Sequence, residues 1–326
     1  MTVGYPNVRK LVAVVIASLT LAGTWIVASA EPAFVSMGTG PVSGIYYPTG
    51  RSICDVVNAV AGMTLRCSVE ATPGSVYNVE AVASGEIEFA LIQSDVQFFS
   101  SRGEGHWKNR PVGKLRSVMS LYPELLTIMA RPDAGIHDLD GLKGKRVNIG
   151  MSGTGTRATW DEIADTFGIS AGDLMEAAKL KPAAAIERMC AKTLDANLLI
   201  VGHPSKMVES QLATCGLVLA GASEERISKL VSSRPYYVSA TIPAAYYGLG
   251  SDVRTFGVKA TLVSSADVPD DLVYVLVKTI MMNLDNLKAQ SPSLAGLKPE
   301  EMISQSLTAP LHPGAARAYR ELGLLK

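Results

Sequence analysis

The sequence predicts an α/β protein of two lobes that are joined by a hinge, with a ligand cleft between the lobes. A strand, a glycine-rich loop and a helix follow one another in residues 34–60, and the same succession returns in residues 146–167. Apolar strand-like segments alternate with helical patterns after each loop, which is typical of parallel sheets. A late apolar segment, 256–264, is expected to return to the first lobe. We therefore expect residues 31–127 and 251–326 to form lobe one and residues 128–250 to form lobe two.

The first 30 residues have the pattern of a secretory signal peptide. Arg9 and Lys10 precede an uncharged apolar run from Leu11 to Val27, and Ala28-Ser29-Ala30 has the small-x-small form of a cleavage site. We expect cleavage after Ala30 and a periplasmic location. A membrane anchor is the alternative, because the run approaches the length that spans a bilayer.

The charge of the exported part is close to neutral. The chain has 30 basic and 30 acidic residues, and Arg9 and Lys10 are the basic residues that precede the cleavage site, so 28 basic and 30 acidic residues remain, with a net charge of −2. This balance argues against nucleic acid as a partner. We expect a monomer that carries no cofactor.

Four cysteines follow the cleavage site, and four cysteines allow three pairings. The local pairs Cys54–Cys67 and Cys190–Cys215 are the economical choice, since each joins a helix-like segment to the next strand-like one. An oxidising compartment favours these bonds over free thiols. No CxxC motif occurs and the four histidines are scattered, so we expect no zinc site.

The first glycine-rich loop contains Gly38, Gly40 and Gly44 and leads into a helix that we expect to begin near Gly50. A strand, loop and helix in this order direct unpaired N–H groups and a positive helix end toward one point, which attracts anions. The loop pattern alone leaves open a dinucleotide site, with Glu70 as the ribose-binding acid, another anionic ligand, or a tight turn without a ligand.

Further polar residues follow the next strands. Ser75 follows the strand 65–70 and is expected to cap the next helix, and Gln93, Ser94 and Asp95 follow the strand 87–92. Because ligands bind at the carboxyl ends of parallel strands, we expect these residues and the first loop to gather at one edge. Residues 115–129 are expected to form two strands with a break at 122–124.

The second glycine-rich loop, 150–157, lies between a strand at 146–149 and a helix at 158–167. It offers hydroxyl groups, a helix N-terminus and the guanidinium of Arg157. Gly202 and His203 follow another buried strand. A small carboxylate held between the helix N-termini of two lobes would favour closure of the lobes.

Several segments, in order along the whole exported chain, closely resemble the TAXI family, the solute-binding subunits of TRAP transporters. The segments are 38–50 (GTGPVSGIYYPTG), 69–86 (VEATPGSVYNVEAVASGE), 92–95 (IQSD), 115–124 (LRSVMSLYPE), 142–159 (LKGKRVNIGMSGTGTRAT), 201–205 (VGHPS), 236–243 (YYVSATIP), 256–269 (FGVKATLVSSADVP) and 309–315 (APLHPGA). The resemblance implies a type II periplasmic-binding-protein fold and delivery of a small carboxylate, such as glutamate, glutamine or a related dicarboxylate, to a TRAP membrane permease. The ligand-binding positions that it implies here are Thr39, Gly40, Tyr46, Ser75, Gln93, Ser152, Gly153, Thr154, Thr156, Gly202 and His203.

Two other functions compete with solute binding. A dinucleotide-dependent enzyme would use the first loop only, and free nicotinamide cofactors are scarce outside the cytoplasm. A hydrolase would need a nucleophile such as Ser205 beside His203, but no GxSxG motif is present. We therefore expect a protein that is not an enzyme. A periplasmic sensor that reports ligand occupancy to a signalling partner stays open as an alternative.

Overall fold

The computed structural model describes residues 1–2, 31–234 and 236–326. The signal-peptide prediction rests on residues 3–30, which lie outside the described residues. The chain divides into units 1–31 and 32–326, and the strands and helices lie in the second unit. Within the described part of the chain, no helix combines the length and the apolar character needed to cross a membrane.

The described strands form one mixed sheet in the order β2-β1-β3-β10-β4-β7-β5-β6, with β8 paired to β4 and β9 paired to β10. The strands are β1 (Ala33–Gly38), β2 (Leu65–Glu70), β3 (Phe89–Gln93), β4 (Leu115–Ala130), β5 (Arg146–Asn148), β6 (Glu176–Ala178), β7 (Ala196–Gly202), β8 (Val218–Ala220), β9 (Val238–Ile242) and β10 (Val253–Ser265). Strands β1, β2 and β3 pair in parallel, and so do β5, β6 and β7. The two repeated βαβ regions that the sequence predicts are therefore present.

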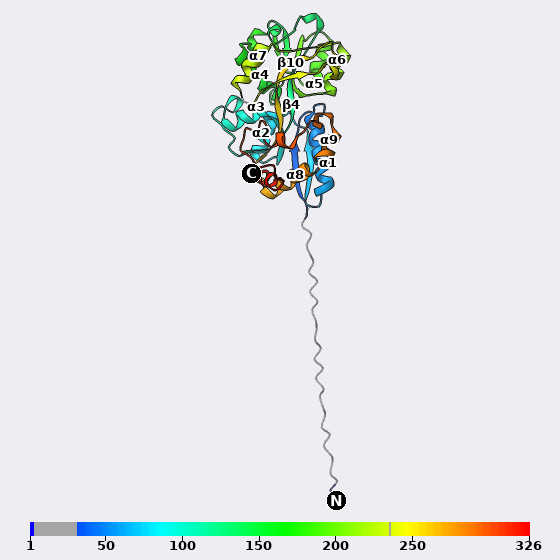
Figure 1. The fold of residues 1–326 in the computed structure, drawn as a ribbon, viewed down its shortest axis with the longest axis vertical. Helices are drawn as coiled ribbons and strands as arrows, with labels where there is room; N and C mark the ends of the chain where they lie inside the picture. Colours follow the sequence, from blue (N-terminus) through cyan, green and yellow to red (C-terminus); the bar gives the residue numbers. More distant parts are fainter. Residues whose placement is uncertain (3–30, 235) are drawn as a thin grey trace. The chain divides into compact units, whose positions relative to one another are not determined.

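Strands β4 and β10 connect these two parallel regions (Figure 1). They run antiparallel to each other, and β4 pairs with β7 through Glu124–Ala130, whereas β10 pairs with β3 through Ala260–Ser264. The division into lobes at 127/128 and 250/251 falls within or beside these two strands and stays a prediction.

The expected break at 122–124 was wrong, because β4 is continuous through Pro123. Pro123 lies opposite Lys259, directly beside a register shift in the pairing of β4 with β10. A proline lacks the N–H that a regular ladder requires, and a bulge is one of the few places where a sheet accepts it.

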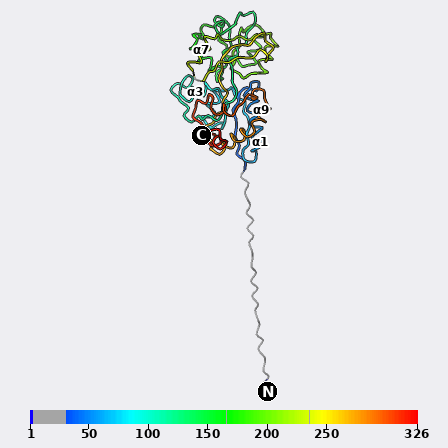
Figure 2. Tube along the Cα trace, in the orientation of Figure 1, coloured from blue at the N-terminus to red at the C-terminus, as the bar shows by residue number. Residues whose placement is uncertain are grey.

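Helices pack on both parallel regions of the sheet (Figure 1). They are α1 (Tyr46–Ala61), α2 (Ser75–Ser84), α3 (Ser94–Arg102), α4 (Gly155–Phe167), α5 (Pro182–Cys190), α6 (Lys206–Cys215), α7 (Glu224–Ser233), α8 (Asp270–Met282), α9 (Leu284–Gln290), α10 (Pro299–Met302) and α11 (Pro313–Glu321). The late helices α8, α9 and α11 share a core with α1 through side chains such as Val57, Leu276 and Tyr319. The trace shows this return of the red C-terminal segment to the blue N-terminal one (Figure 2).

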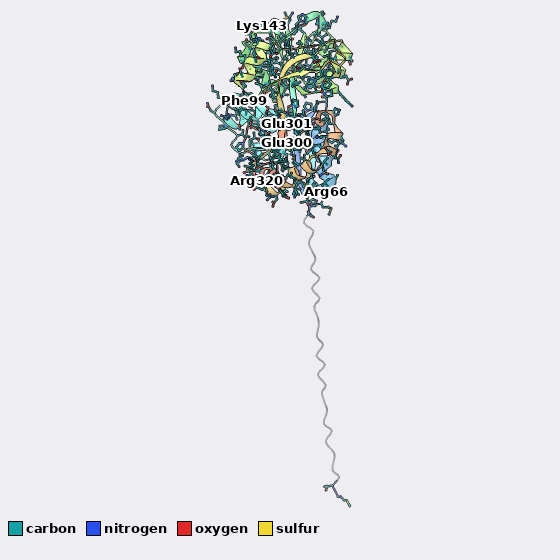
Figure 3. The ribbon with its side chains drawn as sticks, viewed as in Figure 1. Arg66, Phe99, Lys143, Glu300, Glu301 and Arg320 are labelled. Carbon is teal, nitrogen blue, oxygen red and sulfur yellow. A yellow bond between two sulfur atoms is a disulfide. The ribbon has the colours of Figure 1, made fainter. Side chains whose placement is uncertain are left out.

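The core of the second parallel region has two parts. Trp160 of α4 and Ile227 of α7 belong to the core that also contains Phe256, and Met189 of α5 and Val208 of α6 belong to a smaller cluster. Charged side chains such as Arg66 and Arg320 lie at the surface (Figure 3).

Both predicted disulfide pairs are confirmed. Cys54 of α1 bonds to Cys67 of β2, and Cys190 at the end of α5 bonds to Cys215 at the end of α6, with Cα–Cα distances of 5.0 and 4.9 Å. The second bond ties together the C-termini of α5 and α6.

Candidate functional site

A pocket of about 640 Å³ lies at the carboxyl ends of the parallel strands. Residues that line it follow β1, β2, β5 and β6 within a few positions, and Gln93 and Val201 lie at the ends of β3 and β7. The prediction that polar residues gather at one edge is confirmed for Ser75 and Gln93. It was wrong for Asp95, whose side chain is buried between Thr159 and Tyr237 outside the lining of this pocket.

Four helices begin at this pocket. Their first residues, which all line it, are Tyr46 of α1, Ser75 of α2, Gly155 of α4 and Pro182 of α5. The first-turn N–H groups of a helix have no partner within the helix, and the helix dipole is positive at this end. Several helix N-termini at one pocket therefore give it a positive potential that favours an anion.

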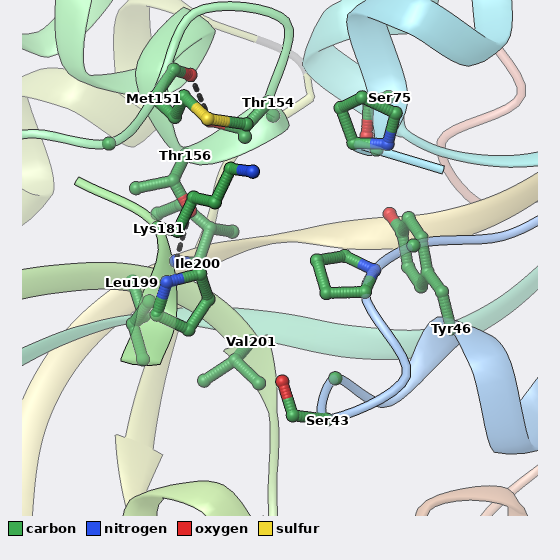
Figure 4. A pocket seen from close by; sticks show the side chains of 18 of the residues that line it. Ser43, Tyr46, Ser75, Met151, Thr154, Thr156, Lys181, Leu199, Ile200 and Val201 are labelled. Carbon is green, nitrogen blue, oxygen red and sulfur yellow. Dashed lines mark hydrogen bonds between the residues drawn. The ribbon is translucent and has the colours of Figure 1, made fainter. Parts of the chain in front are cut away.

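Two ionisable side chains stand out in the lining. Of the described residues that line this pocket, Lys181 carries the only cationic group and Glu124 the only carboxyl group. Lys181 occupies the N-cap position of α5, and its side chain extends into the pocket (Figure 4). Because Lys181 is exposed and has a long side chain, its ammonium group is available to an anion that enters the pocket.

Glu124 forms the deep, neutral part of the pocket. Its side chain is 4% exposed and accepts a hydrogen bond of 2.6 Å from the Tyr46 hydroxyl. Burial raises the pKa of Glu124 to about 8, although the bond from Tyr46 acts in the opposite direction. The carboxyl group is therefore protonated at neutral pH and does not repel an anion.

Gln93 presents a polar group that lacks a partner. Its side chain is 2% exposed and lines the pocket, and its Oε1 atom accepts no hydrogen bond from the described residues. Oε1 lies so close to Gly155 that a Cβ atom at this position would collide with it. A buried polar group without a partner is costly, which indicates that a ligand or water completes its hydrogen bonding.

The first loop differs from its prediction in how its polar groups are used. The helix begins at Tyr46, not near Gly50, so Tyr46 lies in the first helical turn and its hydroxyl is bound to Glu124. Thr39 is fully buried outside the pocket and donates from its hydroxyl to the Glu70 carbonyl at 2.6 Å. Gly40 lines the pocket. The Glu70 side chain is exposed and does not line it, so the ribose-binding role has no support.

The second loop contributes backbone more than hydroxyl groups. Thr154 caps α4 by accepting from the Arg157 N–H at 3.2 Å, and it donates to the Met151 carbonyl at 2.7 Å (Figure 4). The Thr156 hydroxyl accepts from the Ile200 N–H at 3.1 Å. Both threonines line the pocket. The Thr154 hydroxyl is engaged as donor and acceptor, whereas the Thr156 hydroxyl only accepts and can still donate its proton to a ligand.

The remaining positions of the second loop lie outside the pocket lining. Ser152 is exposed, and the Gly153 carbonyl accepts from the Tyr77 N–H at 3.3 Å. Arg157 is held by Asp161 in an ion pair within α4. The cationic group that sequence reasoning assigned to Arg157 is therefore supplied to the pocket by Lys181.

Ser75 was expected to cap α2, and this was wrong. Gly74 occupies the N-cap position, with a positive φ of 126°, and the Ser75 hydroxyl accepts from the Gln93 N–H at 3.1 Å. This bond fixes the end of β3 against the start of α2, so Ser75 positions the backbone that carries Gln93.

Gly202 and His203 lie beside the pocket but do not line it. A Cβ atom at Gly202 would lie 2.9 Å from the Tyr122 ring, so this glycine permits close packing. The His203 ring contacts the Thr127 hydroxyl at 2.9 Å and the Tyr247 hydroxyl at 2.6 Å. Burial lowers the pKa of His203 to about 4, so the ring is neutral.

The arrangement around His203 does not support hydrolysis. The Thr127 hydroxyl donates to the Leu125 carbonyl, so it accepts from Nε2–H of the ring, and Nδ1 accepts from Tyr247. Ser205 instead caps α6. In residues 31–234 and 236–326, no three His, Cys, Asp or Glu side chains form a group that could hold a metal ion.

One side of the pocket is apolar. It is lined by Pro41, Val42, Ile45, Leu180, Pro182, Leu199, Val201 and Met207. Sequence reasoning missed this side, together with Glu124 and Lys181. The apolar residues gave no signal because they are indistinguishable from core residues in the sequence, whereas Lys181 could have been found as the residue before a proline-initiated helix.

Comparisons with known proteins agree with this architecture. A model of the NMT1-like family matches residues 37–323. The periplasmic binding protein BugD is 14% identical and has a TM-score of 0.54, over 89% of this chain and 94% of that chain. The substrate-binding protein of an amino acid ABC transporter is 10% identical, with a TM-score of 0.50 over 80% and 99% of the two chains.

A histidine kinase sensor domain with similarity to periplasmic binding proteins is also similar. It is 13% identical, with a TM-score of 0.51 over 82% of this chain and 97% of that chain. Identities this low establish the fold alone. The chain has the α/β periplasmic-binding-protein fold that the resemblance to binding proteins implied.

Proposed function

The chain belongs to the NMT1-like family, and from this premise we propose that it is a solute-binding protein that captures a small carboxylate and delivers it to a membrane transporter without catalysing a reaction. The observation that carries the proposal is the pocket at the strand ends, where four helices begin and Lys181 supplies a cation. A carboxylate matches this site because helix N-terminal N–H groups and an ammonium group all donate hydrogen bonds to it.

The chemistry of the pocket supports binding over catalysis. Its single carboxyl group, Glu124, is protonated and bonded to Tyr46 at neutral pH, and the loop hydroxyls of Thr154 and Thr156 are bonded to backbone groups. No side chain among these is free to act as an activated nucleophile. Donor groups held in place by backbone structure suit recognition of an anion.

The chain is proposed to act in the periplasm, and its transporter is proposed to be a TRAP permease in the membrane. This part of the proposal rests on the sequence segments that resemble the TAXI family, from 38–50 to 309–315. Co-reconstitution of the exported chain with a candidate TRAP permease in vesicles would test it, with uptake of the bound solute as the readout. Uptake that does not depend on the binding protein would contradict this assignment.

The binding proposal is tested by thermal unfolding in the presence of small carboxylates, including glutamate, glutamine and 2-oxoglutarate as well as monocarboxylates. A ligand at about 100 times its Kd adds about 2.7 kcal/mol and should raise the Tm by several degrees. Lys181→Met should weaken binding roughly tenfold or more, because a hydrogen bond to a charged group contributes about 1.5–3 kcal/mol.

Lys179→Met is the matched control for this experiment. Lys179 is exposed like Lys181, lies two positions away and does not line the pocket. Equal affinity losses in the two variants would indicate a general charge effect and would remove Lys181 from the site. The absence of a Tm shift with any carboxylate would overturn the proposed ligand class.

A further inference from the structure

We propose that the ligand is an amphipathic monocarboxylate, with one anionic head and an apolar tail, in place of a dicarboxylate. The inference rests on the proposed function, since it assumes that this pocket binds a carboxylate. It goes further because it assigns the apolar side of the pocket to the rest of the ligand.

The apolar side is a continuous wall that is part of a core. Ile45, Leu180, Leu199 and Met207 are partly buried and pack against one hydrophobic cluster, to which the pocket-lining residue Val201 also belongs. These side chains come from four separate segments of the chain. Their common packing makes the wall a preformed apolar surface that lines the pocket.

The polar groups lie at the other end of the pocket. Figure 4 shows Ser75 and Thr154 at one end, Leu199 and Val201 at the other, and Lys181 between them. Gly155 begins α4 beside Thr154, so the first-turn N–H groups of α4 lie at the first of these ends. One end is therefore suited to an anionic head and the opposite end to an apolar group.

A dicarboxylate fits this arrangement poorly. Lys181 is the only cationic group among the described lining residues, so the second carboxylate would have no cation of its own. It would lie against the apolar side chains of Ile45, Leu199 and Met207, and the polar side chain that Figure 4 shows beside Val201 is the single hydroxyl of Ser43. Removing a charged group from water without a partner is strongly unfavourable. Burial of an apolar tail at the same place would instead be favourable. Each buried methylene group should increase the affinity about fourfold.

The pocket is also large for a small polar solute. A water molecule takes about 30 Å³ of the liquid, so the volume of about 640 Å³ corresponds to roughly twenty water molecules. A short dicarboxylate would leave water in contact with the apolar wall. A branched or aromatic tail would displace this water, which is a favourable contribution to binding.

Titration calorimetry with isocaproate and succinate on the exported chain tests the inference. The two acids have the same spacing of carbon atoms, but isocaproate ends in an isopropyl group and succinate in a second carboxylate. We expect isocaproate to bind at least tenfold more tightly. Leu199→Asn, which keeps a similar side-chain volume, should remove most of this preference, and Met207→Gln should reduce it.

Leu219→Asn is the matched control, because Leu219 is partly buried against the same cluster and does not line the pocket. It should lower stability but keep the preference for isocaproate. Succinate that binds as tightly as isocaproate, or more tightly, would overturn the inference and leave the proposed function intact. If neither acid binds at millimolar concentration but another carboxylate of the thermal screen does, the inference is wrong and the proposed function stands; if no carboxylate of the screen binds, both are wrong.

Discussion

The two glycine-rich loops share a sequence pattern but contribute different surfaces to the pocket. In the first loop the hydroxyl groups of Thr39 and Tyr46 are bonded to Glu70 and Glu124, so the loop mainly presents apolar side chains such as Ile45. In the second loop the hydroxyl of Thr154 is also engaged, but the start of α4 lies open to the pocket. Glycine spacing thus predicts a strand-to-helix turn, whereas the bonding of the flanking side chains determines what the turn can bind.

The largest effect is expected when one glycine of each loop is replaced by alanine. The two variants should show which loop binds the anion and which only supplies apolar lining. A Cβ atom at Gly155 would collide with Gln93 Oε1 and lie 2.8 Å from the Ser75 hydroxyl. We expect Gly155→Ala to displace α4 and to weaken carboxylate binding roughly tenfold to a hundredfold, the equivalent of one lost charge-assisted hydrogen bond. Calorimetry with the best ligand of the thermal screen measures this loss.

Gly40→Ala is the corresponding change in the first loop. Its Cβ atom would lie 3.4 Å from the Tyr46 Cβ, which is ordinary van der Waals contact. We expect little change in affinity. If both alanine variants bind like the wild type, the start of α4 is not the anion site, and a large loss at Gly40 alone would move that site to the first loop.

The pH dependence of binding should show a smaller effect that arises from Glu124 of β4, the partner of Tyr46. As the pH rises through about 8, Glu124 loses its proton and places a negative charge in a pocket whose only lining cation among the described residues is Lys181. Affinity for an anion should then fall, approaching tenfold per pH unit. Glu124→Gln, which stays neutral, should bind with nearly the same affinity at about pH 7 and pH 9.

The titration of Glu124 should also make the stability of the fold depend on pH. Burial raises the pKa of Glu124 from 4.5 to about 8, so between these values the native state holds a proton that the unfolded state has lost. The free energy of unfolding should therefore decrease as the pH rises through this range. If the ligand affinity of Glu124→Gln falls with pH as steeply as that of the wild type, the pH dependence of binding arises from another group.

The smallest effect is expected at the cap of the second loop. Thr154→Ala removes the hydroxyl that accepts from the Arg157 N–H and should cost about 1 kcal/mol of stability, with little loss of affinity. Thermal unfolding measures the stability and calorimetry measures the affinity on the same samples. Thr154→Ser, which keeps the hydroxyl, should keep the cap and the stability. A loss of affinity without a loss of stability would show that the hydroxyl contacts the ligand directly.

Much of the fold could be predicted from the sequence, since it follows from local patterns. The succession of apolar segments gave the parallel strands, and the short separations between cysteines gave both disulfide pairs. The start of α1 at Tyr46 was missed because Pro48 and Gly50 resemble loop residues, although proline is tolerated in a first helical turn. The continuity of β4 through Pro123 depends on a bulge in its pairing with β10, which no local pattern encodes.

The site was predicted less completely than the fold. Gly40, Tyr46, Ser75, Gln93, Thr154 and Thr156 line the pocket, whereas Thr39, Ser152, Gly153, Gly202 and His203 do not. Whether any of them binds a ligand stays a prediction. Glu124 and Lys181 were missed because their importance depends on burial and on the position of α5, and both are set by tertiary packing.

The paired strands β4 and β10 have a mechanical consequence. Backbone hydrogen bonds join them from Leu115–Ser265 to Leu125–Gly257, and each strand continues from one parallel region of the sheet toward the other. A ribbon of this kind can twist while its hydrogen bonds persist, so we expect separation of the two regions to behave as an elastic deformation with a restoring force. The stiffness of the ribbon, and with it the work needed to admit or release a solute, can then change through residues that never touch the solute.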